Sequence, residues 1–215
     1  MCGRYYLKSE DMNAIIGTLL RTLERKGVPS HAKLNGEIYP GDTAPVLCHN
    51  RAHETRAFFM DWGFDVNQKR IFNARSETAK EKTMFRESMH QHRCIVPASC
   101  YFEWEQTTHQ KMNIRPTSGH SLFLAGLYRP EKDGRYSYTV LTRAAAPHLE
   151  SIHPRMPVIL PADCIMEWMA PRFNPDLILR HALDALTFSP VDSPFPLIST
   201  ASPSKASPSP APRDT

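Results

Sequence analysis

The 215-residue sequence has no long hydrophobic run and no paired cysteine motif. It contains no apolar segment of the roughly 20 residues that a membrane-spanning helix needs, and its amino terminus lacks the apolar core of a signal peptide. The five cysteines are scattered without a Cys-x-x-Cys spacing, which argues against a zinc ribbon or a disulfide framework and favours a reducing compartment. We therefore expect an intracellular protein, in the cytoplasm or nucleoid if the source is bacterial.

Extremes of composition are also missing. Hydrophobic residues make up 41% and charged residues 22% of the chain, as in ordinary globular proteins. The net charge of +4 is a mild basic excess, which permits a nucleic-acid partner without requiring one. The sequence has no internal repeat, coiled-coil pattern or exposed apolar stripe, and we expect a monomer.

The hydrophobic pattern predicts many short strands and a few helices. Helices are expected over residues 9–25, with Ser9 as N-cap, and over 78–92, 162–169 and 176–186. Strands are expected over residues 44–48, 57–60, 94–97, 101–104, 121–128, 136–142 and 158–160, the pair at 121–142 forming a hairpin. This order predicts an α+β fold with a curved, mostly antiparallel and barrel-like sheet flanked by helices.

The composition changes near the carboxyl terminus. Residues 193–215 are rich in Pro, Ser and Ala, and a segment of this kind cannot bury enough apolar surface to offset its ordering entropy. We predict one domain over residues 1–192 and a disordered tail over 193–215.

Cys2 has a chemical possibility that no internal cysteine has. Removal of Met1 would leave a 1,2-aminothiol, whose amine can condense with an aldehyde to an imine that the thiol then closes to a thiazolidine. The α-amine titrates at about 7.7–8.0, so a neutral fraction exists at physiological pH. Taken alone, however, Cys2 is better explained as an ordinary second residue.

Dense polar residues stand beside apolar strands in four stretches. Each has an ordinary explanation by itself: a turn residue, a helix cap, a solvent-facing strand position or a loop histidine. The four stretches are residues 1–5, 73–78 (Asn-Ala-Arg-Ser-Glu-Thr), 97–104 (ending Phe-Glu-Trp) and 153–158 (His-Pro-Arg-Met-Pro-Val).

Taken in order, these stretches resemble one family. With Trp-Gly at 62–63, Arg-Cys-Ile-Val-Pro-Ala at 93–98 and Ala-Gly-Leu-Tyr at 125–128, they follow the order typical of SOS response-associated peptidase (SRAP) domains. The resemblance runs from Cys2 to about Val191. It implies a protein that binds abasic sites in single-stranded DNA or at junctions of single and double strands. It also implies self-removal of Met1, covalent capture of the lesion as a thiazolidine, and lyase or crosslink-reversal activity.

The resemblance also implies catalytic roles for Cys2, Asn73, Glu103 and His153. Cys2 would attack the ring-opened sugar aldehyde, and Asn73 would bond near the Cys2 amine. Glu103 and His153 would move protons. No cofactor and no metal is implied. An imine route independently needs a neutral amine, an acid to expel water and a base for the thiol proton.

DNA contacts are expected from residues near these groups. Arginine pairs with phosphate oxygens in a bidentate fork, and Arg4, Arg75 and Arg155 lie within two or three residues of a proposed catalytic group. Their alternative is structural ion pairing, for instance with Glu77 or Asp61. Candidate stacking or wedge surfaces are Pro40, Trp62 and Trp104, with core packing as the alternative for both tryptophans.

The sequence departs from the family's pattern at three places. Pro154 follows His153 where an acidic residue is common, Cys100 stands where glycine is usual, and the segment between Gly63 and Asn73 is short. None of these departures removes a proposed catalytic residue.

Three other functions compete. Met-Cys-Gly also opens class II glutamine amidotransferases, in which the cysteine thiolate hydrolyses an amide. A non-catalytic module could bind single-stranded DNA through basic residues and tryptophans alone. A metal site at His90, His92 and Cys94 is the weakest alternative, because the spacing joins a helix end to a strand.

Overall fold

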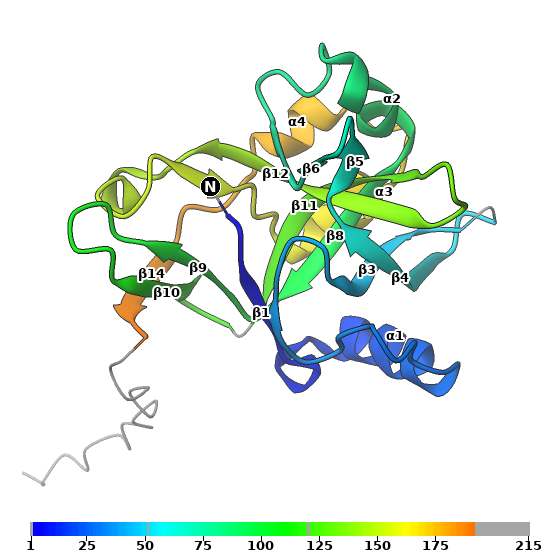
Figure 1. The fold of residues 1–215 in the computed structure, drawn as a ribbon, viewed down its shortest axis with the longest axis horizontal. Coiled ribbons are helices and arrows are strands. Elements are labelled where there is room, and N and C mark those ends of the chain that lie inside the picture. The colour runs from blue at the N-terminus through cyan, green and yellow to red at the C-terminus, as the bar shows by residue number, and fades with distance from the viewer. Residues whose placement is uncertain (1, 51, 120, 192–215) are drawn as a thin grey trace, which may run out of the picture.

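The computed structural model describes residues 2–50, 52–119 and 121–191 (Figure 1). The helices are α1 (Ala14–Arg25), α2 (Thr83–Gln91), α3 (Ile165–Met169) and α4 (Pro175–Leu179), with 3-10 turns η1 (Ser9–Asp11), η2 (Pro147–Leu149) and η3 (Ala162–Cys164). The strands are β1 (Tyr5–Leu7), β2 (Gly36–Ile38), β3 (Thr43–His49), β4 (Thr55–Trp62), β5 (Phe64–Val66), β6 (Lys69–Ile71), β7 (Asn73–Arg75), β8 (Arg93–Ala98), β9 (Cys100–Trp104), β10 (Lys111–Pro116), β11 (Leu122–Pro130), β12 (Tyr136–Ala144), β13 (Arg155–Pro157) and β14 (Leu186–Pro190).

Two sheets form the body of the protein. In the first, the strand order is β14-β10-β9-β1-β2. In the second, β11, β8, β3, β4 and β12 pair in turn, and β12 pairs back to β11, so that these strands close into a ring. β13 and β7 extend the second sheet from β12. Most pairings are antiparallel; β12 runs parallel to β4 and β7. The expected α+β class with a curved, mostly antiparallel sheet is confirmed.

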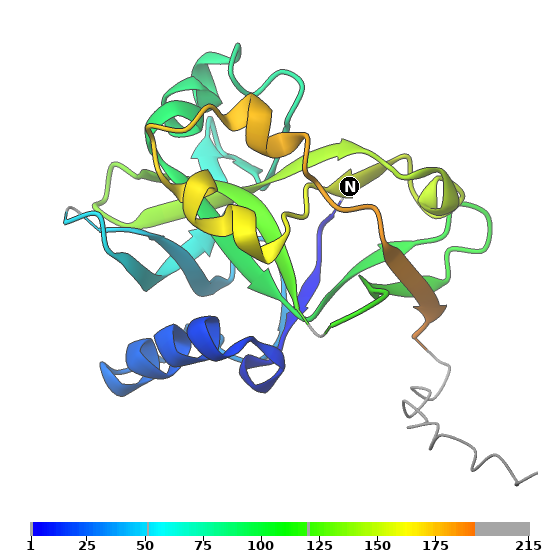
Figure 2. The same cartoon turned by 180° about the vertical axis from the view of Figure 1, so that it is seen from behind.

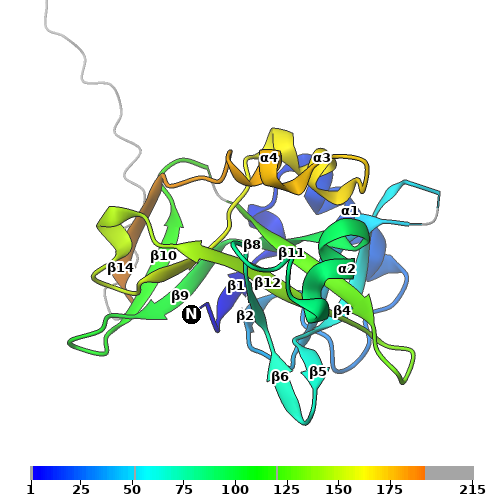
Figure 3. The same cartoon turned by 90° about the horizontal axis from the view of Figure 1, so that it is seen from above.

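Helices cover the ring from different sides. α1 packs against β4, and α3 packs against β8. Figure 2 shows α1 below the sheets, with α3 (yellow) and α4 (orange) in front of them in this view, and Figure 3 shows the β5–β6 hairpin projecting on the side opposite α3 and α4. None of the helices in the described part of the chain is long and apolar enough to cross a membrane.

Several element boundaries differ from the sequence-based prediction. The helix expected from residue 9 begins at Ala14, because the Asn13 side chain, not Ser9, caps it by accepting a hydrogen bond from Ile16 N at 2.9 Å. The helix expected over 176–186 ends at Leu179, and Leu186 already begins β14, which pairs with β10. The tail predicted from residue 193 lies outside the described residues.

Arg93 fastens the helices to the ring. Its side chain is 2% exposed and donates hydrogen bonds to five carbonyl oxygens, those of Met89, His90, Trp168, Ala170 and Phe173. Burial lowers the pKa of Arg93 to about 10, so the guanidinium stays charged at neutral pH. Its charge also complements the carbonyl ends of α2 and α3.

Arg93→Met should therefore cost about 3 kcal/mol or more of unfolding free energy, because it leaves several buried carbonyls without donors. Urea unfolding followed by circular dichroism measures this loss. Arg86→Met on the exposed face of α2 is the matched control, with an expected change within about 0.5 kcal/mol. A loss below about 1 kcal/mol for Arg93→Met would contradict the assignment.

Candidate functional site

Cys2 lies where the two sheets meet. Its side chain is fully buried, and the chain then enters β1, which pairs with β9 of the first sheet (Figure 1). Asn73 begins β7, which pairs with β12 of the second sheet. Asn73 Nδ2 donates a hydrogen bond to the Cys2 carbonyl oxygen at 2.8 Å. The sequence predicts a bond near the Cys2 amine, whereas this acceptor is the carbonyl; the bond still fixes the course of the chain at residue 2.

The Cys2 thiol is held in its neutral form. Burial, and then the charge of Glu103, raise the pKa of Cys2 well above its ordinary value. A thiol is a strong nucleophile only after it has lost its proton. Chemistry at Cys2 therefore depends on neighbouring groups that move protons.

Glu103 is a charged neighbour of Cys2. It is 5% exposed on β9, and the hydrogen bond from Phe102 N to Arg4 O, 2.9 Å long, aligns β9 with the amino-terminal segment. Burial raises the pKa of Glu103 to about 7. Near neutral pH the side chain is thus a mixture of carboxylic acid and carboxylate, which suits a residue that both donates and accepts protons.

His153 lies in the loop before β13. Gln106, in the turn after β9, donates to Glu150 O at 2.8 Å and Ser151 O at 3.4 Å, which fastens this loop beside β9. His153 Nδ1 accepts a hydrogen bond from Arg155 N at 2.9 Å in one tautomer, and in the other it donates to Arg155 O at 3.0 Å. In the tautomer that donates to the carbonyl, Nε2 keeps its lone pair. Burial lowers the pKa of His153, which favours a neutral ring at pH 7.

Arg4 lies between two aromatic rings. Its guanidinium carbon is 4.3 Å from the centre of the Tyr39 ring and 4.8 Å from that of Trp104. Glu37 Oε2 approaches Arg4 Nη1 at 3.5 Å. Both rings are partly exposed, 37% for Tyr39 and 36% for Trp104. The arrangement presents a charged, aromatic surface near the start of β1.

The other two arginines differ from each other. Arg75 is exposed on β7 and remains a candidate for phosphate contact. Arg155 donates to both carboxylate oxygens of Glu77, at 2.6 and 2.9 Å, and to Thr142 O at 2.6 Å. The structural ion pair with Glu77 is thus present. The alternative partner Asp61 is instead paired with Arg135.

Trp62 does not offer a stacking surface. Its side chain is fully buried, its ring stacks on Tyr138 with centroids 6.2 Å apart, and its Nε1 donates to Phe72 O at 3.0 Å. The prediction of Trp62 as a DNA-stacking residue is therefore wrong, because both faces of the indole are covered by the core. Trp104 remains a candidate by its exposure, as does the half-buried Pro40.

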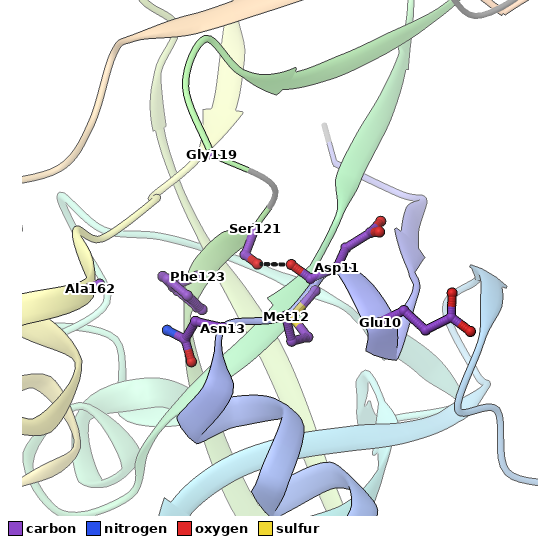
Figure 4. Close-up of a pocket in the computed structure, with 8 residues that line it drawn as sticks. All are labelled: Glu10, Asp11, Met12, Asn13, Gly119, Ser121, Phe123 and Ala162. Carbon is purple, nitrogen blue, oxygen red and sulfur yellow. Dashed lines mark hydrogen bonds between the residues drawn. The ribbon is translucent and has the colours of Figure 1, made fainter. Parts of the chain in front are cut away.

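The surface also holds a cavity away from this site. A pocket of about 560 Å³ lies between η1, the start of α1 and the segment before β11. Figure 4 shows the residues that line it. Ser121 Oγ donates to Asp11 O at 2.7 Å across it, and none of the predicted site residues lines it.

The metal-site alternative fails on geometry. Cys94 is fully buried, and its Sγ lies 2.8 Å from where a Cβ on Gly126 would stand, so the thiol packs into the space above that glycine. The His92 ring packs against Tyr128. Over the described ranges, no group of three metal-ligating side chains comes together.

Comparison with known proteins identifies the family. Residues 1–194 match the family described as SOS response associated peptidase (SRAP). The chain belongs to this family. Abasic site processing protein YoqW of Bacillus subtilis (strain 168) is 37% identical over 198 residues, covering 83% of this chain and 84% of the relative. Abasic site processing protein YedK of Escherichia coli (strain K12) is 27% identical over 179 residues, covering 79% of each.

The fold is also found among solved structures. A phage-related protein from Bordetella bronchiseptica superposes with a TM-score of 0.70 at 22% identity, covering 89% of this chain and 94% of that one. The two-sheet arrangement described above is thus shared by a protein of low sequence identity.

The three departures from the SRAP pattern have structural consequences. Pro154 O accepts a hydrogen bond from Ala145 N at 3.0 Å, so the loop after His153 is tied to the end of β12. Cys100 is 7% exposed and stands opposite Tyr6 of β1. The short segment after Gly63 forms the β5–β6 hairpin.

Sequence reasoning did not find the partners of Arg4. Glu37 and Tyr39 contact Arg4, and Lys111 bonds to Glu37. The sequence gave one sign of this arrangement: Glu37 and Tyr39 alternate along an extended stretch and so share a face. Their contact with Arg4 depends on strand pairing between segments far apart in the sequence.

Proposed function

We propose that this chain binds single-stranded DNA, or junctions of single and double strands, at abasic sites and captures the lesion covalently through Cys2 after loss of Met1. The observation that carries the proposal is the burial of Cys2 next to Glu103, a carboxyl group whose pKa lies near 7. Membership of the SRAP family and the names of its relatives support the same role.

The proposed reaction has two bond-forming stages. The Cys2 amine adds to the aldehyde carbon of the ring-opened sugar, and water leaves to give an imine. The sulfur then bonds to the imine carbon while the thiol proton passes to the nitrogen, which completes a thiazolidine. Glu103 in its acid form donates the proton that the departing water needs. His153, with Nε2 unprotonated, accepts the thiol proton and passes it to the imine nitrogen as the ring closes. Asn73 fixes residue 2 through the carbonyl bond.

Related activities follow from the same groups. We propose that the protein removes its own Met1. We propose that Glu103 and His153 also catalyse two further proton transfers. In strand cleavage, a base takes a proton from the carbon next to the imine carbon and the 3′ phosphate leaves. In reversal of the crosslink, the C–S bond of the thiazolidine breaks and the sulfur receives a proton. The protein is proposed to act as a monomer inside the cell, without metal or cofactor.

The strand is proposed to cross the surface around Arg4. Arg4 and Arg75 would contact phosphates, while Trp104 and Pro40 would contact bases beside the lesion. Arg155 would act chiefly through its pair with Glu77, which positions the segment after His153.

Wild-type protein mixed with a single-stranded oligonucleotide carrying one abasic site tests the proposal. A band that resists heat and detergent on a denaturing gel is expected only with the lesion, from protein whose intact mass shows that Met1 is gone. Absence of this band from such protein would exclude covalent capture. Glutamine hydrolysis and lesion-independent binding, the two competing functions, are then measured on the same sample.

Tryptophan fluorescence tests the proposed strand path. The chain has three tryptophans, and Trp62 and Trp168 are fully buried, so iodide quenching reports on Trp104. Saturating single-stranded DNA should remove most of the iodide quenching, because a stacked base covers the exposed indole. Trp104→Leu should abolish the DNA-dependent change. Undiminished quenching in the complex would contradict stacking on Trp104.

A further inference from the structure

The outer face of the first sheet carries a compact charged cluster. Side chains of alternate residues on a strand share a face, and the register places on this one Arg4, which directly precedes β1, Phe102 and Trp104 of β9, and Lys111 of β10. Glu37 projects from the neighbouring edge strand β2, opposite Tyr6. Figure 1 shows β9 and β10 with β1 beside them.

Glu37 bridges the two cations of this cluster. Lys111 Nζ donates to Glu37 Oε1 at 2.5 Å, and Arg4 Nη1 approaches Glu37 Oε2 at 3.5 Å. The Tyr39 hydroxyl donates to the same Oε2 at 2.9 Å. Lys111 also lies over the Phe102 ring, with Nζ 4.1 Å from its centre. Both oxygens of the Glu37 carboxylate are therefore in contact with neighbouring side chains, which come from β10 and from residues that flank β1 and β2.

These contacts keep Glu37 ionised. Partial burial acts to raise the pKa of Glu37, but the hydrogen bonds from Lys111 and Tyr39 and the nearby positive charges outweigh it, and the pKa lies below the ordinary value. The side chains of Glu37, Arg4 and Lys111 are each only 22–27% exposed, so water screens the cluster less than it would a fully exposed pair.

An arginine and a lysine that together hold one oxyanion form the kind of site that binds a phosphate group. A carboxylate there stabilises the two cations in the free protein. It also competes with any phosphate that approaches them, because two anions at this separation repel each other.

We propose that Glu37 occupies a phosphate position formed by Arg4 and Lys111, and that a phosphodiester of single-stranded DNA takes its place on these cations when the strand binds. This inference rests on the proposed DNA-binding function and assigns Lys111 as a further phosphate contact. Phosphate contacts are independent of the lesion, so competition from Glu37 weakens the binding of intact strands. Strands that carry an abasic site are then held mainly by covalent capture.

Glu37→Gln tests the inference, because it removes the charge and keeps the shape and the acceptor for Tyr39. Binding of a fluorescent, lesion-free oligothymidine is measured by anisotropy across a salt series. The variant should bind about fivefold to tenfold more tightly near 0.1 M salt, comparable to one added charge-assisted contact. Because Glu37 no longer neutralises one of the two cations, the slope of log affinity against log salt should steepen by up to about 0.7, the value for one phosphate contact with a single strand.

Two controls separate a local effect from a general one. Glu54→Gln makes the same charge change in the turn between β3 and β4, where Glu54 pairs with Arg56, and should leave the affinity unchanged. Glu37→Asp keeps the charge and should not reproduce the gain. Adding Lys111→Met to Glu37→Gln should remove most of the gain, which a double-mutant cycle measures as coupling.

The inference is overturned if Glu37→Gln binds no more tightly than wild type, if Glu54→Gln gains equally, or if the gain is undiminished without Lys111. These results are separate from the proposed reaction. Wild type that forms no adduct, together with a Lys111-dependent gain in Glu37→Gln, would reject covalent capture alone. Normal adduct formation without the gain would reject the phosphate position alone.

Discussion

Cys2→Ala is expected to reduce the heat-stable adduct with abasic DNA to an undetectable level. Alanine keeps the α-amine but has no sulfur, so an imine can form and hydrolyse but no thiazolidine can close. Borohydride, which reduces an imine to a stable amine, should restore a covalent band in Cys2→Ala provided that intact mass shows Met1 removed. The measurement is a denaturing gel with and without reductant.

Cys164→Ala is the matched control for this loss. Cys164 is the one cysteine among the described residues that is only partly buried, and it is an internal residue with no α-amine. Its replacement should leave adduct formation at the wild-type level. A heat-stable band that persists in Cys2→Ala without reductant would contradict the role of Cys2. A band lost in both variants would point to damage of the fold and not to chemistry.

Glu103→Gln is expected to slow adduct formation by about 10²- to 10⁴-fold, the usual contribution of a positioned acid or base. Glutamine keeps the size and polarity of the side chain but cannot donate the proton that the leaving water requires. Adduct formation is followed in single-turnover time courses with excess protein. Glu87→Gln, on the exposed side of α2, should not change the rate.

The pH profile distinguishes this role from a structural one. Burial raises the pKa of Glu103 to about 7, so its acid form is depleted as the pH rises through 7. The neutral α-amine becomes more abundant up to about pH 8. The wild-type rate should therefore pass through a maximum between about pH 7 and 8 and then fall, whereas Glu103→Gln should lack the falling limb. An unchanged bell-shaped profile in the variant would falsify the assignment of Glu103 as the acid.

Much of the fold could be predicted from local sequence. The elements that were missed are those whose secondary structure depends on tertiary contacts. The apolar runs at β3, β8 and β11 and the hairpin of β11 with β12 were predicted because each is long and strongly patterned. The three-residue strand β7 was missed, as was β10, whose apolar residues alternate with polar ones. Leu186, the first residue of β14, was assigned to a helix, because its strand form depends on pairing with β10.

For the candidate site, too, some features follow from the sequence and others only from the tertiary structure. The sequence by itself determined which reactive groups the chain has: an aminothiol at Cys2 once Met1 is lost, and an amide, a carboxyl group and an imidazole in motifs that together identified the family. These are properties of covalent structure and residue order. They hold before any long-range contact forms.

Only the tertiary structure decided how those groups behave. Pairing of β1 with β9 placed Cys2 beside Glu103 and buried both, which is what raises their pKa values. Packing of Trp62 into the core removed it from the DNA-contact candidates, although its sequence context resembles that of the exposed Trp104. Strand pairing also brought Glu37 to both Arg4 and Lys111. Burial and charge contacts of this kind arise between segments separated by tens of residues, so local pattern carries little information about them.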